Sequence, residues 1–283
     1  MTADVIQFIT GHYGSLTESE KKVADYLITH FNDAIIMSVH ELSEKVGVSV
    51  ATPVRLAQRM GFKGYKDFRL SLAQRKPAHE DLILDIKQTT NSVSDTVEKV
   101  ISAEIETLKL TLKEIDSSAL QEIALKIKDA KQLIFFGSGT SKLVCSDVAI
   151  KFKRAGKLTH CTDDLYSAAG TLSGFSKKDI VFVCSHSGEN ESACKLIKLA
   201  EKLGLYKVAI TTFSESTISK NADKVLFTQT RESPLHKISL TSRISQLAMM
   251  DALFMSYLSV DYKSCEKNFD SVSENLKSIE LVP

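Results

Sequence analysis

The chain has 283 residues, 43% hydrophobic and 25% charged, and its 36 Lys and Arg balance its 35 Asp and Glu to leave a net charge of +1. This composition is typical of a soluble globular protein, and the length suits two domains of ordinary size. No apolar run reaches the roughly 18 residues of a membrane span, and the N-terminus lacks the basic and small-residue regions of a signal peptide, so we expect a cytoplasmic protein without a membrane partner.

Residues 1–77 are predicted to form an all-α domain of the helix-turn-helix type. Two capping boxes, each a Ser or Thr followed three residues later by Glu, mark helix starts. They are Thr17 with Glu20 and Ser38 with Glu41. Gly47 is expected to end the second helix, and Ser49 is expected to cap a third helix that runs to about Met60.

The same region carries the charge asymmetry of the chain. Between Lys45 and Lys76, eight Lys or Arg stand against one Asp, a net charge of +7. Such a local excess indicates a nucleic-acid surface, and a merely solvated basic face is the alternative. Arg and Gln on the third helix suit base edges, and the basic residues after it suit phosphates. The residues expected to face DNA are Ser49, Thr52, Arg55, Gln58, Arg59, Lys63, Lys66 and Arg69.

Residues 78–130 are predicted to form connecting helices, the first of them marked by an apolar stripe at helical spacing. The stripe consists of Val97, Val100, Ile101, Ile105, Leu108, Leu112 and Ile115. From 131 to 260, five short apolar runs alternate with helical stretches, which predicts an α/β domain with a parallel five-stranded sheet covered on both faces. The runs are QLIFF, KLTHC, DIVFVC, KVAITT and KVLFT. Residues 261–283 are expected to form a C-terminal tail.

Two glycine-containing turns end strands of this predicted sheet, GSGTSK at 137–142 and CSHSGENES at 184–192. GSGTSK lacks the Gly-Lys pair of a P-loop and the third glycine of a dinucleotide fingerprint. Both turns instead offer hydroxyl groups just before a helix, where backbone N–H groups and the helix dipole attract anions. Two such turns meeting at a switch point of the sheet would hold one phosphate monoester. The cysteines and histidines lack metal-binding spacing, so we expect no metal and no cofactor.

These segments resemble a known family. GSGTS followed by SHSGEN resembles the SIS (sugar isomerase) phosphosugar-binding domain, and SVATPVRLAQRMGFKGYKDFR resembles the helix-turn-helix domain of RpiR-type bacterial transcriptional regulators. The resemblance covers nearly the whole chain, and it implies a flavodoxin-like SIS domain, an N-terminal DNA-binding domain and a homodimer. The chain departs from the family at Pro53, where an apolar residue such as Val is usual, and at Asn190, where Thr is usual. Pro53 lies in a first helical turn, so we expect that helix to begin a residue or two late.

The resemblance also implies a ligand site. It assigns phosphate binding to Ser138, Ser141, Ser185, Ser187 and Asn190, and we add Gly139 and Thr140 of the first turn as ligand-binding residues. His160, on the strand next to the first turn, is expected to line the sugar pocket. Glu189 and Lys237 lie in segments that reach toward the ligand, and Lys237 is the one expected to cross to a dimer partner.

The sequence thus predicts a transcriptional repressor of a sugar or amino-sugar catabolic operon, with operator DNA and a sugar phosphate as partners. Likeness to family members that control sialic acid catabolism implies N-acetylmannosamine 6-phosphate as the effector. One alternative is a sugar-phosphate isomerase that uses Glu189 or His160 as its base. Another is a sugar-phosphate-dependent regulator of a second protein. Because no acid and base pair is evident, we assign no catalytic residue and do not expect an enzyme.

Overall fold

A computed structural model of the protein describes residues 13, 16–30, 34, 37–73, 92–212, 214, 216–230 and 240–279. The chain forms two compact units, the first reaching Ala103 and the second beginning at Glu104. Within the described residues, no helix has both the length and the apolar composition that crossing a lipid bilayer requires.

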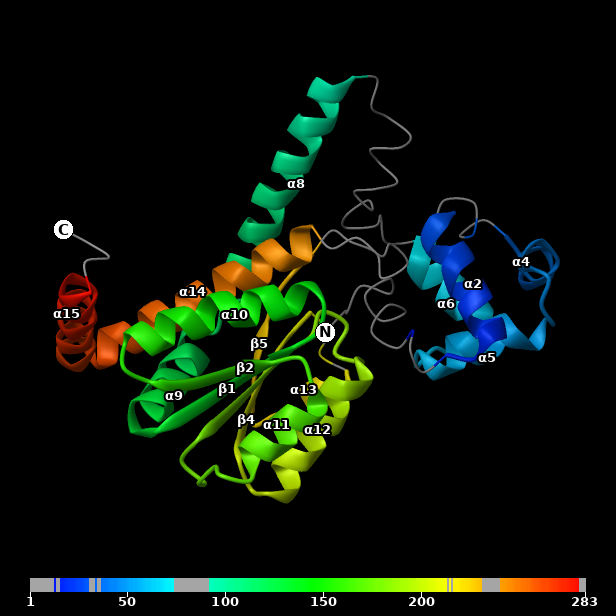
Figure 1. The fold of residues 1–283 in the computed structure, drawn as a ribbon. Helices are drawn as coiled ribbons and strands as arrows, with labels where there is room; N and C mark the ends of the chain where they lie inside the picture. Colours follow the sequence, from blue (N-terminus) through cyan, green and yellow to red (C-terminus); the bar gives the residue numbers. More distant parts are fainter. Residues whose placement is uncertain are drawn as a thin grey trace. The chain divides into compact units, whose positions relative to one another are not determined.

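The first unit is helical, as predicted (Figure 1). Its described helices are α2 (Glu18–Thr29), α4 (Val39–Val46), α5 (Ala51–Arg59) and α6 (Tyr65–Ala73). Both predicted capping boxes are present, because Thr17 N donates to Glu20 Oε2 at 2.9 Å and Ser38 N donates to Glu41 Oε2 at 2.6 Å. Gly47 ends α4 with a left-handed φ of 70°. The helices enclose one apolar core that includes Val23, Ala24, Leu27, Leu42, Leu56, Ala57 and Phe68.

The start of α5 differs from the prediction. The residue before the helix is Val50, whose side chain makes no capping hydrogen bond, and the Ser49 hydroxyl instead lies 3.0 Å from the Thr52 hydroxyl. The prediction that Ser49 caps this helix was therefore wrong. The helix begins at Ala51, one residue later than a Ser49 cap would place its start, as expected. Pro53 is its third residue, where a first-turn N–H has no intrahelical partner to lose.

The second unit is built on the predicted five-stranded sheet, in which all neighbouring strands pair in parallel in the order β2-β1-β3-β4-β5. The strands are β1 (Gln132–Gly137), β2 (Leu158–Thr162), β3 (Ile180–Cys184), β4 (Tyr206–Thr211) and β5 (Lys224–Phe227). The helices are α9 (Ser117–Asp129), α10 (Thr140–Arg154), α11 (Leu165–Leu172), α12 (Glu191–Lys202), α13 (Thr217–Asn221), α14 (Thr241–Val260) and α15 (Tyr262–Ser278).

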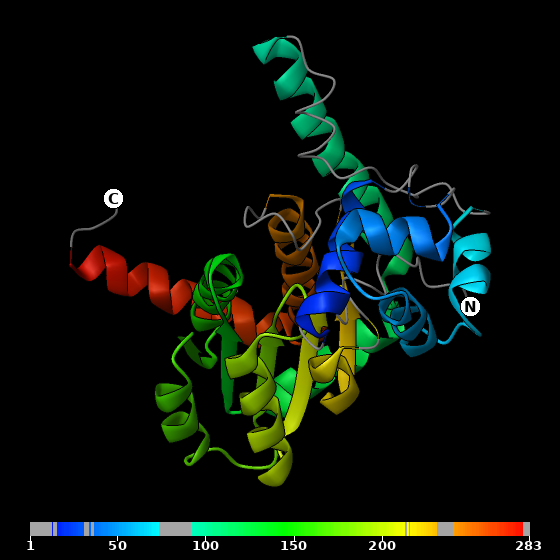
Figure 2. The ribbon, with the colours of Figure 1, turned by 90° about the vertical axis from the view of Figure 1, so that its right-hand side faces the viewer.

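Helices cover both faces of the sheet, so the strands carry almost uninterrupted apolar runs. On one face α9, α10 and α14 pack around Phe135, Phe152 and Phe182, with the rings of Phe135 and Phe182 stacked at 4.5 Å. On the other face α11, α12 and α13 pack on the alternate residues of β1, β3 and β4. Figures 1 and 2 show these two helical layers with the sheet between them.

The expected tail is a helix instead. In α15, Cys265 is fully buried against the core, and Asn268 Nδ2 donates to the carbonyl oxygen of Ala155 at 3.2 Å. Most of α15 is polar, so its single buried face gave only a weak apolar signal in the sequence. The helix is part of the second unit.

Asp179 joins the starts of two central strands at the amino end of the sheet. This buried carboxylate accepts hydrogen bonds from the backbone N–H groups of Lys131, Gln132 and Ser176, at 3.1, 2.8 and 2.7 Å. Burial alone would raise the pKa of Asp179, but these hydrogen bonds hold it below its ordinary value. The carboxylate therefore stabilises the strand ends in its charged form.

We expect Asp179→Ala to lower the free energy of unfolding by about 3 kcal/mol, because three backbone N–H groups lose their charged acceptor. A carboxyl group with a lowered native pKa stabilises the protein fully above its unfolded pKa of about 4, and that contribution is lost as pH falls through the native pKa. Urea unfolding between pH 7 and pH 3 measures this. An equal loss of stability with falling pH in the Asp179→Ala variant would show that Asp179 is not responsible.

Candidate phosphate site and nucleic-acid interface

The two glycine-containing turns lie side by side at the centre of the sheet. β1 and β3 are neighbours, and their last residues, Gly137 and Cys184, are paired in register. From β1 the chain goes through α10 to β2 on one side, whereas β3 leads to β4 on the other, so this is the switch point of the sheet. The predicted convergence of the turns is confirmed, and Ser138 and Ser185 are the first residues beyond the two strands.

The first turn requires glycine at two positions. Gly139 has a φ of 60° and a ψ of −128°, a conformation that residues with a Cβ atom rarely adopt. At Gly137, a Cβ atom would lie 2.8 Å from the carbonyl oxygen of Ser141, so the strand and α10 approach too closely for any side chain. Because Gly139 precedes α10 without a side-chain cap, the first amides of the helix are left for another acceptor.

The second turn presents two hydroxyl groups. Ser185 Oγ accepts from Gly188 N, and Ser187 Oγ accepts from Glu189 N, each at 3.2 Å. Each oxygen uses a lone pair in this way, so its O–H group can still donate. Asn190 is the residue before α12, and its Oδ1 accepts from Ala193 N at 3.1 Å, which leaves the Nδ2 group as the donor. The turn can thus supply hydroxyl and amide donors to a phosphate.

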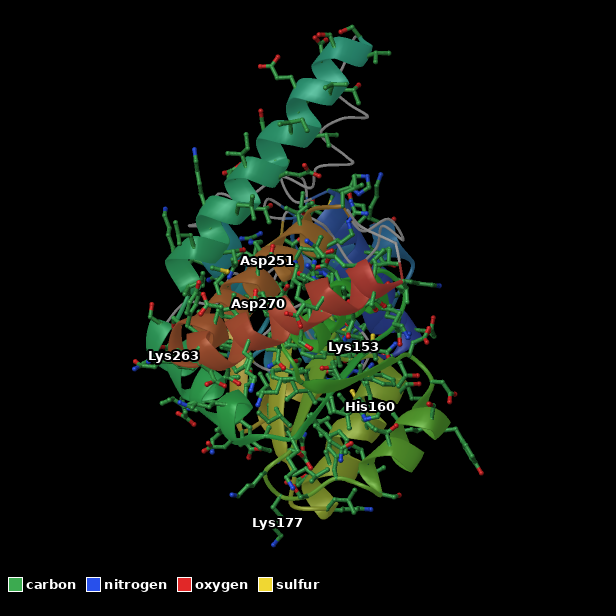
Figure 3. The ribbon with its side chains drawn as sticks, turned by 60° about the vertical axis from the view of Figure 1, so that its left-hand side comes forward. Lys153, His160, Lys177, Asp251, Lys263 and Asp270 are labelled. Atoms are coloured by element: carbon green, nitrogen blue, oxygen red, sulfur yellow. The ribbon has the colours of Figure 1, made fainter. Side chains whose placement is uncertain are left out.

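Of the other three predicted ligand residues, two make other contacts and one lies outside the described residues. His160 Nε2 lies 3.2 Å from Gln132 Oε1 at the amino end of β1, and its ring is 6.0 Å from that of Phe175, away from the turns (Figure 3). The structure therefore does not bring His160 to the predicted site. Glu189 accepts from the N–H and hydroxyl of Thr217 at 2.7 and 2.8 Å. Lys237 lies outside the described residues.

Ser141 belongs to a different contact. It is buried, and its hydroxyl donates to Gln246 Oε1 at 3.1 Å. Gln246, on α14, is 1% exposed, and within the described structure its Nε2 group has no hydrogen-bond partner. Sequence reasoning missed this residue. The available signal was a Gln directly before the apolar run LAMM at 247–250.

We expect Gln246→Leu to change the free energy of unfolding by less than about 1 kcal/mol, since it removes a buried, unpaired amide while keeping the volume. Gln246→Ala should cost about 2–3 kcal/mol because it leaves a cavity. Chemical denaturation of the two variants tests this. Equal destabilisation by Leu and Ala would mean that the amide nitrogen has a partner in solution.

The predicted DNA contacts fall into two groups. Five of them are exposed, as expected: Ser49 before α5, Arg55 and Gln58 on α5, and Lys63 and Lys66 after it. Two other residues that were predicted to contact DNA also interact within the domain. Arg59 Nη1 lies 2.8 Å from Glu20 Oε2, and Arg69 Nη1 donates to the carbonyl oxygen of Met37 at 3.1 Å.

The expected outward position of Thr52 was wrong. Thr52 is 2% exposed, because it lies four and eight residues before Leu56 and Met60 and so shares their buried face of α5.

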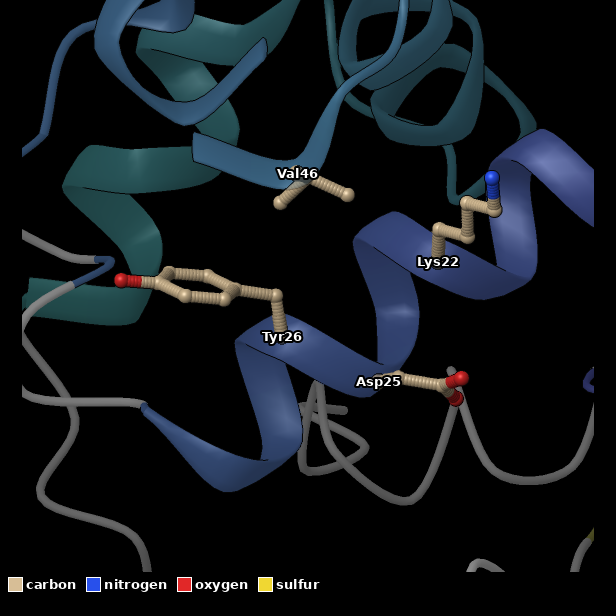
Figure 4. A pocket seen from close by; sticks show the side chains of 4 residues that line it. All are labelled: Lys22, Asp25, Tyr26 and Val46. Carbon is tan, nitrogen blue, oxygen red and sulfur yellow. The ribbon is translucent and has the colours of Figure 1, made fainter. Parts of the chain in front are cut away.

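The same unit has a small pocket between α2 and the end of α4, lined by Lys22, Asp25, Tyr26 and Val46 (Figure 4). With one cation and one anion, this pocket concentrates no positive charge for a phosphate.

Comparison with known proteins places the chain in a family. Residues 3–78 match the helix-turn-helix domain of the rpiR family, and residues 126–256 match the SIS domain. An uncharacterized HTH-type transcriptional regulator of Thermotoga maritima is 31% identical over 93% of this chain and 95% of its own length. The chain belongs to the RpiR family of transcriptional regulators.

Other relatives agree with this assignment. The HTH-type transcriptional regulator RpiR of Escherichia coli K12 is 26% identical over 89% of this chain and 86% of its own. Among solved structures, the Vibrio vulnificus NanR protein complexed with ManNAc-6P has a TM-score of 0.63 and 26% identity, and the match covers 97% of this chain and 98% of that one. The protein is therefore a helix-turn-helix transcriptional regulator with a phosphosugar-binding SIS domain.

Proposed function

We propose that this RpiR-family regulator is a cytoplasmic, non-enzymatic repressor of a sugar or amino-sugar catabolic operon, and that it acts as a homodimer. A phosphorylated sugar at the switch point of the SIS sheet controls its affinity for operator DNA. The pairing of Gly137 with Cys184 supports this most directly, because it sets the two hydroxyl-bearing turns beside each other.

The phosphate contacts that we propose come from both turns. Ser138, Gly139 and Thr140 supply hydroxyls and the first amides of α10, and Ser185, Ser187 and Asn190 supply donors from the second turn. We do not assign Lys142 to the phosphate, because its Nζ lies 3.2 Å from Asp163 Oδ1 and pairs with that carboxylate. A helix N-terminus with convergent N–H and O–H donors suits a phosphate dianion.

N-acetylmannosamine 6-phosphate is the effector that we propose. The support is the similarity to the Vibrio vulnificus NanR protein, whose structure holds ManNAc-6P, over nearly the whole of both chains. The phosphate end of such a ligand matches the turns, whereas the side chains that would recognise the acetamido group are not assigned. Screening hexose and N-acetylhexosamine 6-phosphates separates this effector from other sugars.

On the DNA side, we propose that Arg55 and Gln58 read base edges from α5 and that Lys63 and Lys66 contact phosphates. All four are exposed, and Arg and Gln pair bidentately with guanine and adenine. In a dimer, two recognition helices must lie about 34–36 Å apart to enter successive major grooves. An effector that binds one spacing better than another shifts the equilibrium by that difference in affinity.

An isomerase is less well supported than a regulator. An isomerase needs a base beside the sugar carbonyl. Of the two candidates, the His160 ring lies against Gln132 and Phe175, and the Glu189 carboxylate is bound at both oxygens by Thr217. Neither side chain is presented to the space between the turns.

A gel-shift with the DNA upstream of the gene, titrated with hexose and N-acetylhexosamine 6-phosphates, tests the proposed function. We expect one compound to change the retained fraction and to be recovered unchanged. Conversion of that compound into its ketose or epimer would indicate an enzyme. Retention that no sugar phosphate alters would contradict effector control.

A further inference from the structure

The side chains of Ser141 and Gln246 join the start of α10 to α14 inside the second unit. Ser141 Oγ donates to Gln246 Oε1 at 3.1 Å, and the two residues are 6% and 1% exposed. The two helices run side by side in the same direction, since the rings of Phe152 and Tyr257 meet further along them at 5.5 Å (Figure 1). Gln246 therefore lies in the half of α14 that is beside the first glycine-containing turn.

The amide group of Gln246 is only half satisfied. Its Nε2 group is buried, and no residue that the structure describes accepts a hydrogen bond from it. A buried donor without an acceptor is rare in folded proteins and destabilises them, so such a group often has a functional reason. This unpaired donor belongs to the same amide whose oxygen holds the Ser141 hydroxyl.

The Ser141 hydroxyl cannot serve Gln246 and a phosphate at the same time, because a hydroxyl group has one proton to donate. The start of α10 is where we propose that the phosphate binds, and the first amides of this helix have no side-chain cap. The amide of Ser141 is one of them, and only Cα and Cβ separate it from the hydroxyl of the same residue. A phosphate held by these amides is therefore within reach of that hydroxyl.

Reversal of the Gln246 amide removes the conflict. The two ends of a glutamine amide have nearly the same size, and the torsion that exchanges them is soft. After the exchange, Nε2 donates to Ser141 Oγ, and the Ser141 O–H group donates to the phosphate. We propose that Gln246 is a positioning residue of the phosphate site, whose amide reverses when a sugar phosphate binds. This inference rests on the proposed function and adds Ser141 to its phosphate contacts.

The exchange gains a hydrogen bond. Before binding, the pair forms only the bond from Ser141 to Gln246. Afterwards it forms two, one from Nε2 to Ser141 and one from Ser141 to the phosphate, and the second is strengthened by the charge of its acceptor. Oε1 loses its donor, but a carbonyl oxygen without a partner is tolerated better than an N–H group without one. Occupancy of the phosphate site thereby changes a contact of α14.

Isothermal titration calorimetry of the full chain with N-acetylmannosamine 6-phosphate tests whether Ser141 reaches the phosphate. We expect Ser141→Ala to weaken binding about tenfold or more. Ser146→Ala, further along the same helix with its hydroxyl beside Cys161, is the matched control and should bind as the wild type does. In a Gln246→Leu background, Ser141→Ala should weaken binding by the same factor, since nothing there competes for the hydroxyl proton.

Gln246→Glu separates the exchange from a fixed arrangement. A carboxylate only accepts hydrogen bonds, so it keeps the Ser141 proton and cannot reverse. In this background, Ser141→Ala should change the affinity by less than about twofold, and the repulsion between carboxylate and phosphate cancels because it is present with and without the hydroxyl. Equal factors for Ser141→Ala in the wild-type and Gln246→Glu backgrounds would overturn the exchange.

Nuclear magnetic resonance covers the case in which the Glu variant does not fold. With isotope-labelled glutamine side chains, the Gln246 signal is the one that Gln246→Leu removes. Inorganic phosphate should move its Nε2 protons downfield, as a new hydrogen bond requires, and Ser141→Ala should abolish that shift. An unmoved signal would overturn the exchange.

The effector site itself is tested apart from the exchange. If Ser185→Ala with Ser187→Ala weakens binding and Ser141→Ala does not, the phosphate site stands and the role of Gln246 falls. If neither change weakens binding, or if the wild type binds neither inorganic phosphate nor the sugar phosphate, the proposed function falls as well.

Discussion

Replacing Ser185 and Ser187 together by alanine is expected to weaken binding of the sugar-phosphate effector about 100-fold or more. Each hydroxyl would lose one hydrogen bond to a charged phosphate, worth about 1.5–3 kcal/mol, and every 1.4 kcal/mol is about tenfold in affinity. The loss falls on the phosphate, so all sugar phosphates should weaken alike. Isothermal titration calorimetry with the effector found by the gel-shift measures it.

The matched control is Ser273→Ala, which removes a hydroxyl that donates to the carbonyl oxygen of Phe269 on α15. It should leave effector affinity unchanged. The double serine variant should also keep its effector-free affinity for DNA, since neither serine belongs to the helical unit. If the effector affinity of the double serine variant were unchanged, the phosphate would not bind at the switch point.

Arg55→Ala is expected to lower operator affinity by about 10- to 100-fold and to relax sequence preference at one base pair. A bidentate contact to a base edge is worth about 1–3 kcal/mol of discrimination. Gln58→Ala should act in the same way at a second position. Fluorescence anisotropy with the operator and with single-base-pair variants of it measures both effects.

Lys63→Ala is the comparison for a phosphate contact. It should weaken binding to all sequences equally and reduce the slope of log affinity against log salt by about 1. Arg59→Ala differs from both, since it also leaves the carboxylate of Glu20 without its cation in the domain. If Arg55→Ala weakened all sequences equally, α5 would contact the DNA backbone and would not read bases.

Local signals in the sequence were enough for most of the fold. The capping boxes of Ser38 and Thr17, the turn at Gly47 and the alternation of apolar strands with helices each involve residues close in the chain, whose conformational preferences act before any packing. The same holds for the two glycine turns. Since parallel strands end at one edge of a sheet, the neighbouring positions of Ser138 and Ser185 followed from their places after strands.

The direction in which individual side chains point was harder to predict from the sequence than the helices and strands. Thr52 was placed on the wrong face of α5 because its polarity outweighed its spacing from Leu56 and Met60. His160 lies on the expected strand, but only the packing of Phe175 and the acceptor on Gln132 turn its ring toward the amino end of the sheet. Contacts between residues so far apart in the chain have no local signature.

By itself, the sequence determined the helix-turn-helix unit, the parallel sheet and its two hydroxyl-bearing turns, because periodicity and turn chemistry act over a few residues. The tertiary structure alone decided that Gln246 binds Ser141 and that α15 packs on the second unit, because both contacts join residues far apart in the chain.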